Sequence, residues 1–156
     1  MLQETISTVR ALAYGLRPPA LDHMGLVSVL ATYCEEFSEQ SGLKIDFHSV
    51  GVKNLQLHPD TEINVYRLIQ EGLNNVKKHA GASQATVNLV GAASNIILRI
   101  EDDGYGFDVE KRARAATREK RMGLRSMEER VSLLQGQMTI RSRPMKGTKI
   151  FIKFPY

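Results

Sequence analysis

The chain has 156 residues, the size of one domain, with 42% hydrophobic and 24% charged residues, as in ordinary globular proteins. It contains no run of 18 apolar residues, which excludes a membrane-spanning helix in this sequence. Its single cysteine, Cys34, excludes an internal disulfide and a cysteine metal cluster. One cysteine suits a reducing compartment, so we expect a cytoplasmic domain, whether or not the full-length protein is membrane-anchored elsewhere.

The net charge of +4 comes from one segment, residues 108–125, which holds seven Lys or Arg and three Asp or Glu. A local basic cluster favours a triphosphate or an acidic partner surface over a nucleic-acid duplex. Basic and aromatic residues do not interleave on any face, so we expect no direct nucleic-acid binding.

The first third of the chain predicts two helices joined by a proline-rich linker. Residues 2–16 have one apolar stripe, and Pro18-Pro19 ends it. This helix begins without an N-cap, so we expect it to be the end of a longer helix. After the linker 16–26, residues 25–41 have apolar side chains at helical spacing, with Cys34 packed beside them.

The centre of the chain predicts a strand at 43–49, a weak strand at 52–57, and a long helix from Pro59 to Gly81. On a wheel of about 100° per residue, Asn75 and Lys78 lie within about 40° of Glu71. The opposite face is apolar. The polar face is either an ordinary solvated surface or a functional row.

The last part predicts strands at 84–90 and 95–101, joined as a hairpin, and then the turn Asp102-Asp103-Gly104-Tyr105-Gly106. Residues 108–122 predict a loop with a short helix at 110–116. A helix at 123–134 and strands at 137–142 and 149–154 follow. The order favours a two-layer α/β sandwich, with helices on one face of a mixed, mostly antiparallel sheet.

A helix carrying Glu and Asn on one face, followed by a strand and Asp-x-Gly-x-Gly, resembles the ATP-binding domain of gyrase B, heat-shock chaperone ATPases, sensor histidine kinases and mismatch-repair ATPases. This is the Bergerat-type ATP-binding fold. The resemblance lies in the N box, residues 71–79, and in the first glycine box, residues 102–106. Gly123-Leu-Arg-Ser-Met127 resembles a shortened second glycine box, and Gly147-Thr148 resembles the last box.

The linker GLRPPALDHMGL, residues 15–26, narrows the resemblance to sensor histidine kinases of the nitrate-sensor type. That resemblance implies that residues 1–18 end a dimerisation and phosphoacceptor region, and that residues 19–156 form the catalytic domain. The implied partners are ATP, the dimerisation domain of the same kinase, and a response regulator with a helix-turn-helix output domain. The full-length protein is then expected to be a homodimer.

The resemblance assigns the base-binding end of the site to Asp102, Gly104, Gly106 and Thr148. Asp102 would accept from the adenine amine; the alternative is a turn Asp that caps its own backbone. Gly104 and Gly106 would let the chain turn beside the base. The Thr148 hydroxyl would support Asp102, often through water, unless Thr148 is an ordinary strand residue. Asp103 is expected to face solvent.

The phosphate end is assigned in the same way. Asn75 matches the ligand of Mg²⁺, and Lys78 and His79 match positions that approach phosphates, although His79 could equally be a packing residue. Glu71 would orient the phosphoryl acceptor or a metal-bound water. Gly123 and Leu124 would turn helix N-terminal amides towards the phosphates. The basic loop would be the ATP lid, with phosphate contacts from one or more of Arg118, Lys120, Arg121 and Arg125.

Three positions depart from the family pattern. Val76 stands where Ala is usual, and Gln135 and Met145 stand where Gly is usual. The two replaced glycines lie at turns, so we expect them to affect turn geometry rather than chemistry.

The implied reaction transfers the γ-phosphoryl of Mg-ATP to a histidine and then to a response-regulator aspartate. None of the four histidines, at 23, 48, 58 and 79, resembles the acceptor. We therefore expect a fragment that binds nucleotide but does not phosphorylate itself. The alternatives are a serine kinase of the anti-sigma-factor type and a nucleotide-binding signalling module without catalysis.

Overall fold

The computed structural model describes residues 17–108 and 118–156, with the side chains of 118–121 outside the description. The predicted helices at 2–16 and 110–116 lie outside the described residues, as do the side chains of Arg118, Lys120 and Arg121. In chain order the elements are α2 (Ala20–Met24), α3 (Leu26–Ser41), β1 (Lys44–Val50), α4 (Pro59–Asn75), the π-helix η1 (Val76–Ala80), β2 (Gln84–Ala92), β3 (Asn95–Asp102), α6 (Arg118–Leu133), β4 (Gln137–Ser142) and β5 (Thr148–Pro155).

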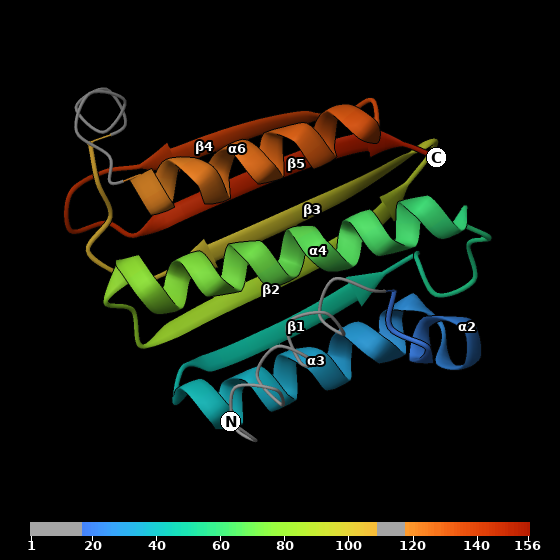
Figure 1. Cartoon of the computed structure of the whole chain (residues 1–156), viewed down its shortest axis with the longest axis horizontal. Helices are drawn as coiled ribbons and strands as arrows, with labels where there is room; N and C mark the ends of the chain where they lie inside the picture. The colour runs from blue at the N-terminus through green and yellow to red at the C-terminus, as the bar shows by residue number, and fades with distance from the viewer. Residues whose placement is uncertain (1–16, 109–117) are drawn as a thin grey trace, which may run out of the picture.

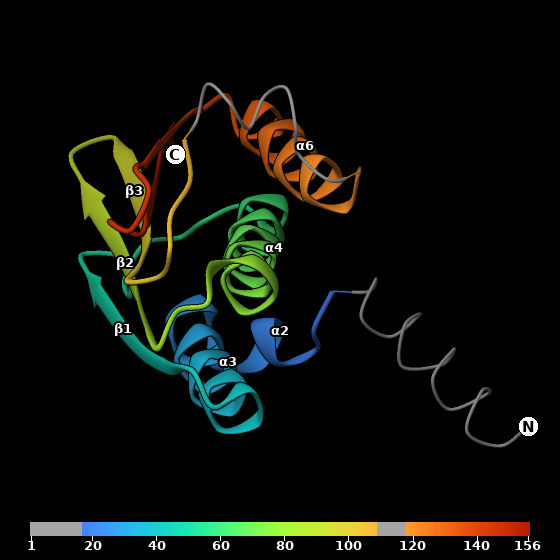
Figure 2. The same ribbon diagram turned by 90° about the vertical axis from the view of Figure 1, so that its left-hand side faces the viewer.

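The sheet has five strands in the order β1-β2-β3-β5-β4, and α3, α4 and α6 lie side by side on one of its faces (Figures 1 and 2). Strand β1 is parallel to β2, whereas the other three strand pairs are antiparallel. The predicted two-layer sandwich is confirmed. Because α4 lies over the middle of the sheet, its last turn reaches the end of β3, where the glycine-rich turn begins.

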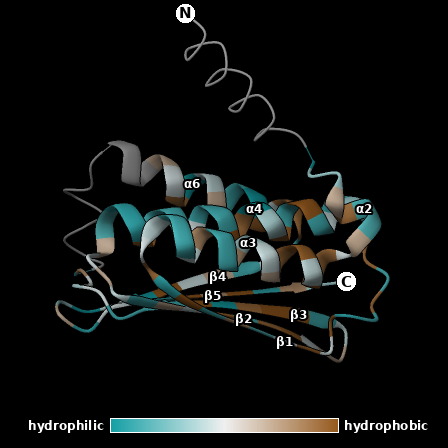
Figure 3. Cartoon of the chain, turned by 90° about the horizontal axis from the view of Figure 1, so that it is seen from below, coloured by the Kyte–Doolittle hydropathy of each residue, from teal (hydrophilic) through white to brown (hydrophobic). Residues whose placement is uncertain are grey.

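The core forms between the two layers, where the hydrophobic sides of helices and strands face each other (Figure 3). On β3 the burial alternates, with Ile96, Leu98 and Ile100 buried and Arg99 exposed. On α4 the predicted apolar face is buried at Ile69, Leu73 and Val76. The buried side of β3, with a period of two residues, and the buried side of α4, with a period of about 3.6 residues, thus pack into one core.

Cys34 packs into this core, as predicted, and is 2% exposed. Burial raises the pKa of the Cys34 thiol to about 12. The thiol is therefore neutral at physiological pH and serves as a small apolar side chain.

Two local predictions are wrong. The predicted linker contains the short helix α2, and residues 52–57 form turns and irregular chain rather than a strand, with Leu55 N–H donating to Val52 O at 3.0 Å. The N-cap of α4 is His58, whose Nδ1 accepts from Asp60 N–H at 3.1 Å. Pro59 occupies the first helical position, as predicted, where its missing N–H leaves no intrahelical hydrogen bond unmade.

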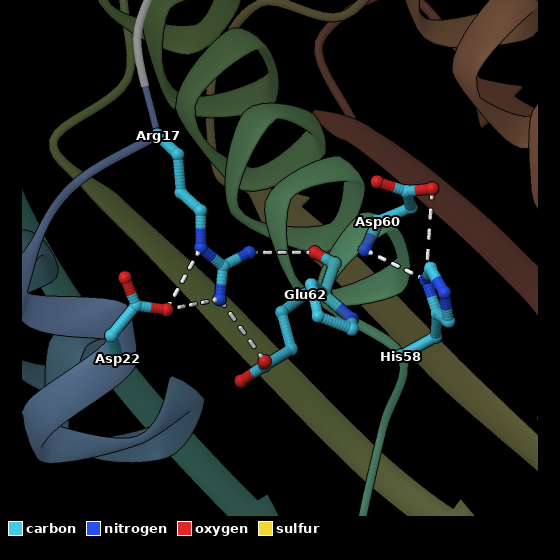
Figure 4. A network of polar contacts seen from close by, with 6 residues as sticks. Arg17, Asp22, His58, Asp60 and Glu62 are labelled. Atoms are coloured by element: carbon cyan, nitrogen blue, oxygen red, sulfur yellow. Dashed lines mark hydrogen bonds and ion pairs between the residues drawn. The ribbon is translucent and has the colours of Figure 1, made fainter.

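Arg17 attaches the linker to the beginning of α4 (Figure 4). Its guanidinium donates to Pro59 O at 2.7 Å and to Glu62 Oε1 at 3.3 Å, and it lies 3.1 Å from Asp22 Oδ1. The Arg17 and Glu62 side chains are 26% and 18% exposed, so this contact is partly shielded from solvent. The segment leading into the domain is thereby held against the helix that carries the N box.

Candidate nucleotide-binding site

A cavity opens between the last turns of α4, the end of β3, the beginning of β5 and α6. It is lined by Gly72, Asn75, Val76, His79, Ala80, Asp102, Gly106, Phe107, Leu124, Ile140, Thr148 and Ile150. The cavity therefore brings together residues of all four predicted boxes. It leaves about 40 Å³ for the centres of water molecules, room for only a few waters.

The N-box helix reaches this cavity because it lies close to the sheet. Gly72 is buried, and a Cβ at that position would collide with the Ile100 side chain on β3. After Asn75 the helix widens into the π-helix η1, where Val76 N–H is shared between the carbonyls of Gly72 and Leu73. The sequence did not predict this widening. It places His79 in the cavity wall, while Lys78 is exposed and outside that wall.

Glu71 and Asn75 lie one helical turn apart and face α6. A Cβ on Gly123 would lie 2.5 Å from Glu71 Oε1 and 3.1 Å from Asn75 Oδ1. Two oxygen atoms therefore converge beside Gly123. Asn75 Nδ2 also lies 3.9 Å from Met127 Sδ, so α6 packs directly on this polar pair.

The predicted role of Gly123 is wrong in one respect. Helix α6 begins at Arg118, so Gly123 is its sixth residue. Only the first four amides of a helix lack an intrahelical acceptor, so the Gly123 amide does not form the expected helix N-terminal site. Residues 118–121 are Arg, Glu, Lys and Arg, all good helix formers, and they extend the helix backwards. What Gly123 provides is close approach to Glu71 and Asn75.

The first glycine box forms a tight turn at the end of β3. Asp102 Oδ1 accepts from Gly104 N–H at 2.8 Å, and the same carboxylate lines the cavity. The two readings of Asp102 are therefore compatible. Gly104 is buried where a Cβ would collide with Ala80 O, and Tyr105 N–H donates to that oxygen at 2.8 Å. This turn thus packs on η1, and the two boxes position each other.

Asp103 points to solvent, as expected, but it also holds the beginning of β2. It accepts from Ser83 N–H at 2.9 Å, from Ser83 Oγ–H at 2.7 Å and from Gln84 N–H at 3.0 Å. The hydrogen bonds from the Gln84 backbone and the Ser83 hydroxyl lower the pKa of Asp103 below its ordinary value. No local sequence pattern indicates this role, because Ser83 and Asp103 are 20 residues apart.

Thr148 is the cross-strand partner of Asp102 and lines the cavity with it. Its Oγ1 lies 2.9 Å from the hydroxyl of Ser142, a residue that the sequence did not single out. Ser142 is paired with Thr148 across β4 and β5, so only the strand register could have pointed to it.

Arg130 was also missed. It reaches from α6 to α4, where its Nη1 donates to Asn64 Oδ1 at 3.2 Å. Burial is the main cause that lowers the pKa of Arg130, and the charge of Arg67 adds to it, whereas Glu71 opposes the shift. A polar seam therefore continues from the Glu71–Asn75 pair along the interface of the two helices.

Comparison with known proteins then places the chain. Residues 60–156 match the family model described as histidine kinase-, DNA gyrase B- and HSP90-like ATPase. The chain belongs to this ATPase family. Two proteins described as signal transduction histidine-protein kinase/phosphatase DegS, from Brevibacillus brevis and Bacillus subtilis, are 37% and 39% identical to it over 155 and 141 residues. These alignments cover 99% and 89% of this chain but only 39% and 36% of the relatives.

The sensor histidine kinase ComP of Bacillus subtilis is 34% identical over 155 residues, which are 97% of this chain and 19% of ComP. The chain thus spans well under half the length of these relatives. Among solved structures, the histidine kinase domain of the Erythrobacter litoralis EL346 blue-light activated kinase has a TM-score of 0.64 at 19% identity, covering 83% of this chain and 60% of that one. At that identity the likeness supports the fold.

The departures from the family pattern have a clear structural outcome. Gln135 and Met145 both have left-handed backbone, with φ of 56° and 63°. Glycine adopts this conformation without steric cost, whereas other residues do not. The expectation that these two positions concern turn geometry is therefore confirmed. Val76 is buried, at 6% exposure, beneath the cavity.

The residues present fit a magnesium ion only if the nucleotide supplies further ligands. Among the described residues there is no group of three or more His, Cys, Asp or Glu that could hold a metal. The converging oxygens of Glu71 and Asn75 are hard donors of the kind that Mg²⁺ prefers, and Mg²⁺ commonly takes one or two protein ligands together with phosphates.

No described helix is long and apolar enough to cross a membrane.

Proposed function

We propose that this chain is the ATP-binding catalytic domain of a two-component sensor histidine kinase. The observation that carries the proposal is that Asp102 and Thr148 line the same cavity as Asn75 and His79, between the sheet and α4. In the reaction, a histidine nitrogen of the dimerisation domain bonds to the γ-phosphorus of ATP while the bond to the β–γ bridging oxygen breaks and ADP leaves. Positioning and charge neutralisation carry such a transfer.

The adenine end is assigned to Asp102, whose carboxylate accepts from the exocyclic amine. An acceptor left unpaired in a buried site is unfavourable, so this contact selects a base with a donor at that position. Gly106 lines the same wall, where a Cβ would collide with Arg143 O. The buried Gly104 keeps the turn packed on η1.

The phosphate end is assigned to Asn75, His79 and Lys78. Asn75 offers its amide oxygen to Mg²⁺, which would neutralise charge on the triphosphate. Lys78 is exposed one turn beyond Asn75, where a flexible ammonium can reach a phosphate from outside. Glu71, half-buried beside Gly123, orients the phosphoryl acceptor or a water. Leu124 covers the cavity from α6.

The rest of the protein is proposed from the linker and the relatives. We assign residues 1–18 to the end of the dimerisation and phosphoacceptor region, residues 19–156 to the catalytic domain, and the whole to the nitrate-sensor type. Its partners would then be the dimerisation domain of a cytoplasmic homodimer and a response regulator with a helix-turn-helix output domain. His23, His48 and His58 are exposed at α2, β1 and the α4 cap, away from the cavity.

Calorimetric titration of a non-hydrolysable ATP analogue with Mg²⁺ tests the proposal. The parent should bind, Asp102→Asn should lose binding by tenfold or more (about 1.4 kcal/mol), and Asp103→Asn, the matched neighbour, should retain it. Phosphotransfer to a supplied dimerisation domain is the second step. Acid-labile phosphohistidine is expected, whereas acid-stable phosphoserine would support the serine-kinase alternative. A folded parent that binds no nucleotide would overturn the assignment.

A further inference from the structure

The hydroxyl of Ser142, at the end of β4, joins three segments beside the cavity. Phe107 N–H donates to its oxygen at 2.9 Å, and the hydroxyl donates to Gly147 O at 3.0 Å. The third contact, at 2.9 Å, is to Thr148 Oγ1. None of the roles proposed above uses Ser142, yet both Phe107 and Thr148 line the cavity.

The direction of each hydrogen bond follows from counting protons. A hydroxyl has one proton and two lone pairs. A carbonyl oxygen can only accept, so Ser142 gives its proton to Gly147. A backbone amide can only donate, so Phe107 occupies one lone pair of Ser142. One lone pair remains, and the contact with Thr148 is a hydrogen bond only if Thr148 donates to it.

Gly147, in the last box, holds the hydrogen bonds of Ser142 in place. Gly147 is buried with a φ of +71°, and a Cβ there would collide with Asp102 O. The left-handed conformation lets the chain pass this close to β3 and fixes the carbonyl that receives the Ser142 proton. The hydroxyl of Ser142 therefore has no second orientation that satisfies all three contacts.

We infer that Ser142 is a specificity-determining residue for the nucleotide base, because it holds the Thr148 hydroxyl as an acceptor towards the cavity. The inference rests on the proposed function. Thr148 is the cross-strand partner of Asp102, and both line the cavity. With its proton engaged by Ser142, Thr148 offers only lone pairs to the base, as an ionised carboxylate does.

Two consequences follow for recognition. Thr148 cannot donate directly to Asp102, so any link between them runs through a water that donates to both. The amine of adenine meets acceptors, whereas the carbonyl at the same ring position of guanine would face acceptors and stay unpaired. Without the Ser142 hydroxyl, Thr148 can turn its proton into the cavity and donate to that carbonyl.

The experiment compares the dissociation constants of matched non-hydrolysable ATP and GTP analogues, both with Mg²⁺, for the parent and Ser142→Ala. We expect the preference for the ATP analogue to fall roughly two- to tenfold, the size of one neutral hydrogen bond. A role confined to packing would weaken both nucleotides equally and leave the ratio unchanged. Circular dichroism and the melting temperature show that each variant is folded.

A second pair of variants keeps the test sharp if Ser142→Ala does not fold. Thr148→Ser retains a hydroxyl and should keep the preference, whereas Thr148→Val should lower it, leaving the part that Asp102 provides. In the Thr148→Val background, Ser142→Ala should change the ratio no further, since Ser142 acts through Thr148.

The results also separate this inference from the proposed function. An unchanged ratio in a folded Ser142→Ala variant that binds ATP overturns the role of Ser142 alone, as does a ratio that is unchanged in Thr148→Val. A folded parent that binds neither analogue overturns the proposed function, and the inference with it.

Discussion

Gly123 on α6 lies so close to Glu71 on α4 that a Cβ at Gly123 would be 2.5 Å from Glu71 Oε1. The same Cβ would be 3.1 Å from Asn75 Oδ1. The absence of a side chain at Gly123 is therefore what allows the two helices to enclose the candidate metal- and acceptor-binding pair.

Gly123→Ala should weaken binding of Mg²⁺ and the ATP analogue by tenfold or more, because Glu71 and Asn75 must move to avoid the methyl group. Overpacking destabilises the fold by about 1–3 kcal/mol, while alanine recovers about 1 kcal/mol of helix propensity. The two effects oppose each other, so the melting temperature should fall only slightly although the affinity falls strongly. Calorimetry and thermal unfolding measure the two effects.

The control is Ser132→Ala, an exposed position on the same helix. It gains helix propensity without approaching α4, so its nucleotide affinity should equal that of the parent. If Gly123→Ala binds as tightly as this control, the close approach has no functional role.

Met145 should be replaceable by glycine without loss of stability. Its φ of 63° is unfavourable for a side chain by about 1–2 kcal/mol, and the side chain is 73% exposed, so little packing is lost. Glycine also makes the unfolded chain more flexible, which offsets about 0.4–1 kcal/mol. The free energy of unfolding of Met145→Gly, from urea titration, should therefore be equal to or above that of the parent.

Lys146→Gly is the matched control, since Lys146 is exposed and its φ is not positive. It should lower the free energy of unfolding, because only the unfolded-chain effect remains. Equal losses at the two neighbouring positions would contradict a conformational role for the replaced glycine.

Asp103 should contribute stability that depends on pH. Its folded pKa is lowered by hydrogen bonds from Gln84 N–H and the Ser83 hydroxyl, so the contribution is fully present above the ordinary Asp pKa of about 3.9 and disappears as pH falls through the lowered folded value. Thermal unfolding of the parent and of Asp103→Asn, measured from pH 7 to pH 2, should give a difference in melting temperature that disappears at the acid end.

Glu128→Gln, which changes an exposed carboxylate on α6, serves as the reference for general charge effects. A gap between the parent and Asp103→Asn that stays constant over the whole pH range would mean that the carboxylate charge does not hold the beginning of β2.

Arg17→Ala should loosen the attachment of the linker to α4 and lower stability by about 1 kcal/mol, because it removes contacts to Pro59 O and Glu62. Arg17→Lys should recover only part, since an ammonium lacks the planar fork that serves three partners at once. Hydrogen exchange at the first turn of α4 should be slowest in the parent, faster in Arg17→Lys and fastest in Arg17→Ala.

Asp22→Asn is the matched control, because Asp22 is 62% exposed and forms the outer contact of Arg17. It should have little effect. Unchanged exchange at the first turn of α4 in Arg17→Ala would show that the network seen in Figure 4 does not hold this end of the helix.

Many elements of this protein are specified by local sequence patterns. The alternation of Ile96, Leu98 and Ile100 and the apolar face with Ile69, Leu73 and Val76 specify a strand and a helix by their periods alone. Local patterns also predicted the position of the nucleotide site, through Glu71, Asn75 and the turn Asp102-Asp103-Gly104-Tyr105-Gly106. Such signals are readable because each depends on residues that are near neighbours in the chain.

Other features arise only when distant segments meet. The sequence pattern placed the beginning of α6 at Gly123, whereas the helix begins at Arg118, in a run of good helix formers. The roles of Ser142, Arg130 and Ser83 depend on strand register and helix contact, over separations of five to 66 residues. Because a hydrogen bond or a steric fit is decided by ångström distances, the chain specified which elements form, and their packing decided which side chains share the cavity.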